Sequence, residues 1–353
     1  MGSAVAWHLA RRGRRVVGLE QFEPGHDLGG SHGRSRIFRL AYGQDDYVRL
    51  AVEALPLWRA LEDEAGVEIL VQGGAIDHGS SVVLDRIGAA FARHGLEAAL
   101  LGQAEAERRW AGFRFDGPVL YSPDGGRTDA DAALFALQQR AAALGAEMRF
   151  SSPVRSVHVR GEGVVVETGG DTVEADVVVV TANAWLPKLL SGIVEVPPMR
   201  ITQEQPAFFA PLDGAATWPS FIHYVGEGQL ASDFAAYGVP SPAEGGVKVG
   251  EHGTGIEIDP DGERPPPDPV RIERLSDYVR LHLPGLNPDP SGISRCLYDM
   301  TADEDFVVDR VGRVVIGGGF SGHGFKFVPS VGRLLADLAD GIPHQIGRFS
   351  ARR

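Results

Sequence analysis

The first twenty residues restrict the possible folds more than any other part of the chain. Residues 3–12 have the pattern of a helix that stops before Gly13, and residues 16–19 form a short apolar strand followed by Glu20. In a dinucleotide-binding βαβ unit the helix opens at the last glycine of G-x-G-x-x-G, and an acid about 20 residues later binds the ribose hydroxyls. Gly2 and Glu20 stand at these two places. The pattern predicts two thirds of a βαβ unit, although many α/β proteins without a nucleotide site share it.

A second junction of strand, glycines and helix lies near the end of the chain. Residues 314–316 are a strand, the loop GGGFSGHGF follows, and residues 329–340 form a helix. Glycines in such a loop let backbone N–H groups approach a ligand closely. Lys326 stands between Phe325 and Phe327, just ahead of the helix. It is either a side chain that snorkels at the loop edge or a cation held for an anionic ligand, and the sequence leaves both interpretations open.

The rest of the chain alternates between helical and extended patterns. Apolar spacing predicts helices at 47–65, 82–94, 130–144 and 270–283. Runs of β-branched residues predict strands at 148–151, 154–159, 164–168 and 173–180. The last run ends in four valines, which suit a central strand covered on both faces, and mixed strands are expected over 201–250. At roughly 150 residues per domain, this α/β chain of 353 residues has about two domains.

The composition excludes several classes of partner and site. Asp and Glu outnumber Lys and Arg by 47 to 34, a net charge of −13, so we expect no general attraction to nucleic acid or to a membrane. One cysteine excludes an intrachain disulfide, and without an H-x-x-x-H pair we expect no metal. Nucleophile-elbow and phosphate-loop motifs are also absent. Because no apolar run has transmembrane length and no signal peptide is present, the sequence predicts a cytoplasmic protein.

Two arginines and the cysteine are each open to two interpretations. Arg36 and Arg39 share a face if their segment is helical and point in opposite directions if it is extended. Their spacing alone favours solvated surface arginines over a pair that binds an anion. Cys296 lies in the strand-like segment RCLYDM, where burial statistics favour a small buried hydrophobic residue over a reactive thiol.

Four separated segments resemble one protein family, in the same order along the chain. They are LEQFEPGHDLGGSHGRSRIFRLAY, GVKVGEHGTG, CLYDMTADEDFVVDR and GGGFSGHGFKFVPSVGRLLADL. Over essentially the whole chain the sequence resembles the monomeric sarcosine oxidase and N-methyltryptophan oxidase family of flavoproteins. The resemblance implies an α/β fold, α+β overall, with a glutathione-reductase-like FAD-binding domain and a mainly antiparallel substrate domain. The expected FAD-binding domain comprises residues 1–75, 140–200 and 305–353, and the substrate domain comprises residues 76–139 and 201–304.

The resemblance also implies roles for individual residues. Cys296 matches the cysteine that is bonded through sulfur to the 8α carbon of the flavin, and Arg39 and Lys326 match the pair that grips the substrate carboxylate. Lys248 matches the lysine linked to oxygen activation. The remaining matches to catalytic positions, beside the flavin ring or the substrate, are Arg36, His252, Tyr237 and Tyr298. Further implied FAD contacts are Gly2, Glu20, Ser31, His32, Ser35, Arg36, Gly319, Phe320, Gly322, His323, Gly324 and Lys326.

The activity implied by the resemblance is oxidation of N-alkyl (secondary) amino acids such as sarcosine by O2. The product imine hydrolyses to an aldehyde and an amine, and O2 is reduced to hydrogen peroxide. The expected partners are a small amino acid and O2, and the protein is expected to be a monomer. Two alternatives stay open: a non-catalytic relative that lacks the flavin, and an oxidase of primary or D-amino acids, although the latter leaves Cys296 unexplained.

The chain departs from the family pattern at two places. The first strand and the first two glycines of G-x-G-x-x-G are absent, which we expect to open the centre of the parallel sheet. Because all other motifs are intact, we interpret this as a start codon assigned too far downstream or as a fragment of the gene. In the segment TANAW, Asn183 replaces an expected glycine, a minor change because Asn tolerates positive φ.

Overall fold

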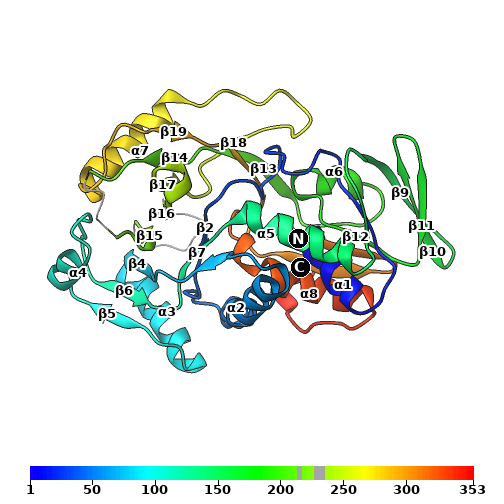
Figure 1. Cartoon of the computed structure of the whole chain (residues 1–353), viewed down its shortest axis with the longest axis horizontal. Helices are drawn as coiled ribbons and strands as arrows, with labels where there is room; N and C mark the ends of the chain where they lie inside the picture. Colours follow the sequence, from blue (N-terminus) through cyan, green and yellow to red (C-terminus); the bar gives the residue numbers. More distant parts are fainter. Residues whose placement is uncertain (213–216, 226–234) are drawn as a thin grey trace.

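Helix α1 (Gly2–Arg11) and its neighbours form one side of the molecule (Figure 1). The structure is a computed structural model that describes residues 1–212, 217–225 and 235–353. Strand β1 (Val17–Leu19) pairs in parallel with β8 (Glu147–Arg149), and β12 (Val178–Val180) pairs in parallel with β22 (Val314–Gly318). Within the described residues these are two separate sheets, which agrees with the open centre expected from the sequence.

Three further helices and a fifth strand complete this side. Helix α1 packs against α5 (Ala130–Ala143) and α8 (Val328–Ala339), and α8 also packs against α2 (Asp45–Ala65). Strand β21 (Val307–Val311) joins the edge of β22 in antiparallel pairing. A Cβ atom at Gly332 would lie 2.5 Å from Cβ of Ala4, so the glycine allows α8 to approach α1 closely.

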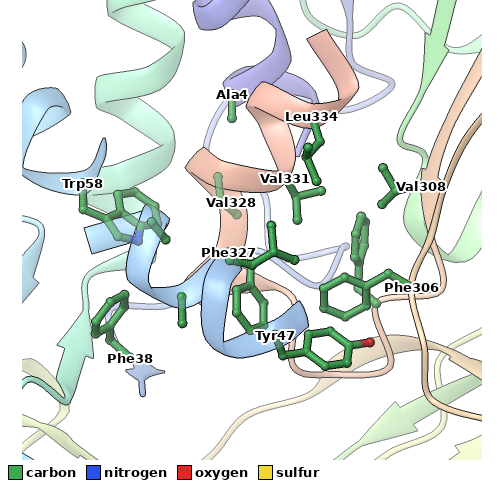
Figure 2. Packing of buried hydrophobic residues seen from close by; sticks show 14 of the residues in the cluster. Ala4, Phe38, Tyr47, Trp58, Phe306, Val308, Phe327, Val328, Val331 and Leu334 are labelled. Carbon is green, nitrogen blue, oxygen red and sulfur yellow. The ribbon is translucent and has the colours of Figure 1, made fainter. Parts of the chain in front are cut away.

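A core of aromatic and aliphatic side chains joins α2, α8 and strand β21 (Figure 2). Trp58 of α2 is fully buried, and its indole Nε1 donates to the backbone oxygen of Lys326 at 3.0 Å. The rings of Phe306 and Phe327 lie 5.6 Å apart and edge-on, and Tyr47 contacts both. This core therefore fixes the backbone on which Lys326 stands.

The other side is built on an eight-stranded sheet (Figure 1). Its order is β19 (Gly292–Ile293), β14 (Ala207–Phe209), β17 (Gly246–Glu251), β16 (Ala235–Ser241), β15 (Ser220–Tyr224), β4 (Ala75–Gly79), β6 (Val119–Ser122) and β5 (Ala99–Leu101). Neighbouring strands are antiparallel except β4 and β15, which run parallel with His78 opposite His223. Helix α7 (Pro269–His282) packs against β17, and α3 (Ser81–His94) against β4.

Smaller elements connect the two sides. Strand β20 (Cys296–Thr301) lies beside β13 (Met199–Glu204), which also pairs with β18 (Ile256–Glu257). A second small sheet contains β2 (Arg36–Phe38), β7 (Gly126–Thr128) and β3 (Leu70–Val71). The remaining elements are the hairpin sheet β9 (Val154–Arg160), β10 (Gly163–Thr168) and β11 (Thr172–Ala175), the helices α4 (Gln103–Arg109) and α6 (Leu186–Leu190), and the 3-10 turns η1 (Asn183–Trp185), η2 (Pro242–Glu244), η3 (Phe325–Phe327) and η4 (Gly347–Phe349). No helix in the described part of the chain is both long and apolar enough to cross a membrane.

One strand prediction was wrong. The stretch 173–180 is two strands, β11 at the edge of the hairpin sheet and β12 in the parallel sheet, because exposed Asp176 interrupts the apolar run. Strand β12 lies at the edge of its described sheet, and β22 takes the central place predicted for the valine run. Of the mixed strands expected over 201–250, residues 213–216 and 226–234 lie outside the described residues, and the rest holds β13 to β17.

Candidate active site

A cavity lies where β2, β16, β17, β20 and the loop before α8 meet. Most residues that the sequence analysis assigned to a site line this cavity, although they come from segments far apart in the chain. The predicted residues on its wall are Ser31, Ser35, Arg36, Arg39, Tyr237, Lys248, His252, Cys296, Tyr298, Phe320, Gly322, His323, Gly324 and Lys326. The fold therefore brings together the residues on which the resemblance rests.

Arg39 follows strand β2 and is only 6% exposed, so the interpretation of it as a surface arginine was wrong. Its Nη1 donates to the hydroxyl of Tyr224 at 3.0 Å, to Oδ1 of Asp77 at 3.3 Å and to the backbone oxygen of Ala41. The guanidinium carbon lies 4.3 Å from the centre of the Tyr42 ring. These hydrogen bonds leave from Nη1, and Arg39 also makes a side-chain hydrogen bond with Tyr42. A guanidinium has five N–H groups, so others on Nη2 and Nε are left for another acceptor.

Lys326 reaches the same part of the cavity from turn η3. Its Nζ donates to the hydroxyl of Tyr42 at 3.0 Å and to the backbone oxygen of His323 at 2.6 Å. The Tyr42 hydroxyl in turn lies 3.2 Å from Nδ1 of His323. Burial, together with the charge of Arg39, holds the pKa of Lys326 well below its usual range. A bound anion would oppose both effects, so this end of the cavity is suited to a carboxylate.

A second pair of cations lies beside strands β2 and β17. Arg36 donates to the backbone oxygen of Ser35 at 3.0 Å and of Gly30 at 3.2 Å, and also to that of His32. Lys248 is buried, and its Nζ donates to the same backbone oxygen of Ser35. Burial, with the nearby charge of Arg36, lowers the pKa of Lys248 to about 7.

Cys296 opens strand β20 and is buried against the cavity, as the small-hydrophobe interpretation expects, but its thiol lies in polar surroundings. Burial alone would raise its pKa. A hydrogen bond with His32 and the charges of Arg36 and Lys248 outweigh burial and lower the pKa of the Cys296 thiol to about 6. Since the thiolate is the nucleophilic form of cysteine, this environment favours reaction at sulfur.

The phenol groups of Tyr237 and Tyr298 hydrogen-bond to each other across the cavity wall. Burial raises the pKa of both phenols, so both stay neutral. The His252 ring lies 6.0 Å from the Tyr298 ring, and its Nε2 lies 3.5 Å from Oε2 of Glu304. This end of the cavity is therefore polar, in contrast with the cationic end at Arg39.

Glycine is required at one point of the loop before α8. Gly322 has a φ of 74°, and a Cβ atom there would lie 2.0 Å from the Tyr298 ring. From the sequence, these glycines are expected at positions where the backbone approaches a ligand closely. At Gly322 the group in close contact is the side chain of Tyr298, so the glycine positions a wall residue of the cavity.

Four predicted site residues are not on the wall of the cavity in the described structure: Gly2, Glu20, His32 and Gly319. Glu20 follows β1, and its carboxylate accepts from the backbone N–H of Phe22 at 3.1 Å. His32 lies one layer behind, where Nε2 is 3.0 Å from the backbone oxygen of Arg295. Asn183, which replaces an expected glycine, has a φ of 47° as its tolerance for positive φ predicts, and it lines the cavity.

Sequence reasoning missed the groups that hold these residues in place. Asp77 is buried and accepts from Arg39 and from the Tyr224 hydroxyl, and burial raises its pKa to about 6. Asp299 accepts from the backbone N–H groups of Gly319 and Phe320, and burial raises its pKa to about 7. A charged residue inside an apolar strand was the available signal for Asp77, which stands in AIDHG.

The comparisons with known proteins agree with this geometry. Residues 1–338 match the family model described as FAD dependent oxidoreductase, DAO. The chain is 32% identical to monomeric sarcosine oxidase from a Bacillus species, over 100% of this chain and 94% of the relative. It is 33% identical to human peroxisomal sarcosine oxidase, over 99% of this chain and 93% of the relative. It is also 28% identical to N-methyl-L-tryptophan oxidase from Yersinia pestis, over 100% of this chain and 96% of the relative.

Solved structures share the fold. NikD, described as an unusual amino acid oxidase essential for nikkomycin biosynthesis, superposes with a TM-score of 0.86 at 28% identity, covering 99% of this chain and 94% of that chain. L-proline dehydrogenase from P. horikoshii superposes with a TM-score of 0.85 at 21% identity, covering the same shares, and this likeness concerns the fold alone.

The residues around the cavity suit the flavin end of FAD. The wall holds the Cys296 thiol, whose pKa is lowered, with the cations Arg36 and Lys248 beside it. It also includes the start of the helical segment formed by η3 and α8, where backbone N–H groups favour negative charge. From the cavity and from the match over residues 1–338, we conclude that the chain belongs to the FAD dependent oxidoreductase (DAO) family.

Proposed function

We propose that this protein oxidises N-alkyl (secondary) amino acids such as sarcosine, with FAD as cofactor and O2 as the electron acceptor. The observation that carries the proposal is the pair of buried cations, Arg39 and Lys326, at one end of a cavity that also holds Cys296. An acidic chain with a net charge of −13 places two positive side chains together, which favours an anionic substrate group there.

We propose that the substrate carboxylate binds between Arg39 and Lys326. Arg39 has N–H groups on Nη2 and Nε for two hydrogen bonds, which match the two oxygens of a carboxylate. Lys326 uses two of its three Nζ donors within the protein, so a third is left for the substrate. Asp77 and Tyr224 hold the guanidinium from behind and limit its rotation.

The proposed place of the substrate nitrogen is the polar end, near Tyr237, Tyr298 and His252. Neutral phenols in a buried surrounding favour the uncharged form of the amine, because an ammonium ion would lose its hydration there and the nearby Glu304 carboxylate already faces His252 at 3.5 Å. The uncharged form is the one whose neighbouring C–H bond can give up a hydride. The width of this end sets which N-alkyl group is accepted.

Residues proposed to hold FAD surround the rest of the cavity. Bound FAD would accept two electrons and a proton from the substrate and pass the electrons to O2. We propose that Cys296 forms a covalent bond from its sulfur to the 8α carbon, and that Arg36 lies beside the ring. The Lys248 ammonium is proposed to stabilise the negative charge that develops on O2 as it is reduced. Glu20 and Gly2 are proposed contacts of the adenosine part.

The division of labour is proposed as two discontinuous domains, with one boundary inside helix α5 (Ala130–Ala143). We propose residues 1–75, 140–200 and 305–353 as the FAD-binding domain, and residues 76–139 and 201–304 as the substrate domain. We also propose that the protein is a monomer and that it works in the cytoplasm. Its similarity to bacterial proteins named monomeric sarcosine oxidase supports the monomeric state.

The test is oxidation of matched substrates by the purified protein. We expect sarcosine, O2 and water to give glycine, formaldehyde and hydrogen peroxide in equal amounts, and we expect glycine and D-alanine to give little peroxide. N-methyl-L-tryptophan and pipecolate then measure the width of the polar end. Turnover of D-alanine but not of sarcosine would favour the alternative of a primary amino acid oxidase. Purified protein without flavin absorbance or peroxide formation would favour the non-catalytic alternative.

A further inference from the structure

A cluster of histidines lies on the opposite face of the eight-stranded sheet from Arg39. Side chains alternate between the two faces along a strand. Asp77 on β4 and Tyr224 on β15 point toward Arg39, and their neighbours His78 and His223 therefore point to the opposite face. The two imidazole rings are stacked, with centres 4.1 Å apart and planes inclined by 24°. Neither histidine lines the cavity described above.

His78 lacks the hydrogen bonds that a buried imidazole needs. The side chain is 1% exposed, and neither Nδ1 nor Nε2 has a hydrogen-bond partner in the described structure. Phe115 lies edge-on at 5.0 Å, and its ring does not satisfy either nitrogen. A buried polar group without a partner destabilises the folded state. The unpaired His78 imidazole therefore lowers the free energy of unfolding unless a ligand binds one of its nitrogens.

One ring nitrogen of His223 makes a hydrogen bond that orients the ring, and the other nitrogen can bind a ligand. Its Nδ1 lies 3.1 Å from the hydroxyl of Tyr278, and its Nε2 lies 3.5 Å from Oδ2 of Asp116. Metal-bound histidines commonly use their second nitrogen to donate to an oxygen in this way, which fixes the ring and the tautomer. The Asp116 side chain is 57% exposed, so an ion from solvent can reach the buried histidines beside it.

We infer that His78, His223 and Asp116 form a binding site for a divalent transition-metal ion of the zinc type. One potential ligand atom from each residue lies within 4.8 Å of the other two. Zn–N and Zn–O bonds of roughly 2.0–2.2 Å put the ligand atoms of a tetrahedral site roughly 3.4 Å apart. The separation of 3.5 Å between His223 and Asp116 already matches this value, and rotation of the His78 ring completes the site.

The donor set selects the class of ion. Two imidazole nitrogens and one carboxylate oxygen suit zinc, cobalt or nickel rather than calcium or magnesium, which prefer oxygen ligands. No metal motif is visible in the sequence, because the ligands come from β4, β15 and the loop between α4 and β6, which only the fold brings together.

A metal at this place would join the two parallel strands that hold Arg39 from behind. His78 is adjacent to Asp77, and His223 is adjacent to Tyr224. An ion that fixes both histidines therefore also fixes the register of β4 against β15. The inference does not depend on the substrate or on the reaction proposed above.

The test measures metal binding by the flavin-loaded protein and does not use its enzymatic activity. Equilibrium dialysis against Zn²⁺ gives stoichiometry and affinity, and Co²⁺ reports its coordination through ligand-field absorption at longer wavelengths than oxidised flavin absorbs. Asp116→Asn removes the exposed ligand, and Asp63→Asn, at an exposed site on α2, removes the same charge as a matched control. His78→Phe replaces the unpaired ring by an apolar ring of similar size.

We expect one tightly bound ion per chain in the wild type and in Asp63→Asn, and an affinity lower by 10-fold to 100-fold or more in Asp116→Asn and His78→Phe. We also expect His78→Phe to melt at or above the temperature of the metal-free wild type, because it removes unpaired buried nitrogens. Wild-type protein that binds no Zn²⁺ overturns the inference. Equal affinity in all four proteins overturns it too, since the ion then binds elsewhere.

Discussion

Replacing Arg39 by methionine tests the proposed carboxylate site most directly. The substitution keeps an unbranched apolar stem in a buried position and removes the N–H groups offered to the substrate. A hydrogen bond to a charged group contributes roughly 1.5–3 kcal/mol, so two such bonds contribute roughly 3–6 kcal/mol. At about 1.4 kcal/mol per factor of ten, kcat/KM for sarcosine is expected to fall by about 10² to 10⁴.

The fold is expected to tolerate this change. Removing Arg39 takes away the cation beside Asp77, whose pKa burial already raises to about 6. Asp77 then takes up a proton near neutral pH, because only the charged form needs the arginine, and it keeps its hydrogen bond with Tyr224. Flavin content should therefore stay close to that of the wild type.

The assay combines steady-state oxygen consumption with the binding of acetate, a carboxylate without an amine, followed by flavin absorbance. Arg39→Lys, which keeps the charge but not the paired N–H groups, should lie between wild type and Arg39→Met. Arg34→Met is the matched control, since the Arg34 side chain is 60% exposed and its ion pair within the described residues is with Asp129, at 3.5 Å. If Arg39→Met keeps its KM and its acetate affinity within about threefold of wild type, the carboxylate binds elsewhere and the assignment is refuted.

Three further predictions concern the rest of the cavity. Cys296→Ala should release its flavin into the supernatant on acid precipitation, whereas the wild type keeps it in the pellet; flavin retained in the variant pellet would place the bond at another residue. Lys248→Met should slow reoxidation by O2 in stopped-flow mixing and leave reduction by sarcosine within a few-fold of wild type. In the wild type, reoxidation should slow as pH rises through the pKa of Lys248, which burial and Arg36 lower to about 7, because the ammonium is lost above it; a rate independent of pH between 6 and 8 would contradict this. Gly322→Ala should raise KM and lower the melting temperature, because its Cβ would overlap the Tyr298 ring at a φ of 74°; an unchanged melting curve would show that the loop can move.

Sequence patterns predicted the elements of this fold better than the partners of its site residues. Apolar spacing placed α2, α3, α5, α7 and α8 within a few residues, because a helix face is encoded locally. The prediction of one strand over 173–180 failed because Asp176 lies between two short strands that are both rich in β-branched residues. Local composition could not distinguish β11 from β12, since their partners are at positions far away in the sequence.

In the site, too, local sequence patterns did not predict which residues contact one another. The spacing of Arg36 and Arg39 favoured exposure, and burial of Arg39 results from Asp77 and Tyr224, which stand on two strands of another sheet. Resemblance to a family supplied the roles that spacing could not. It did not supply Asp77, Tyr224 or the histidine pair behind them, because these groups act through contacts that no single segment contains.

The pairing of β22 with β12 and of α8 with α1 has a consequence for biosynthesis. Strand β22 and helix α8 are translated long after α1, yet Ala4 and Trp7 of α1 need α8 and α5 to be fully buried. While the ribosome is still translating the middle of the chain, the nascent N-terminal helix therefore exposes apolar surface with no partner to cover it. Transiently exposed apolar surface of this kind makes a partly synthesised chain prone to aggregation until its partners have been made. Folding of this side can finish only after residue 339 has left the ribosome.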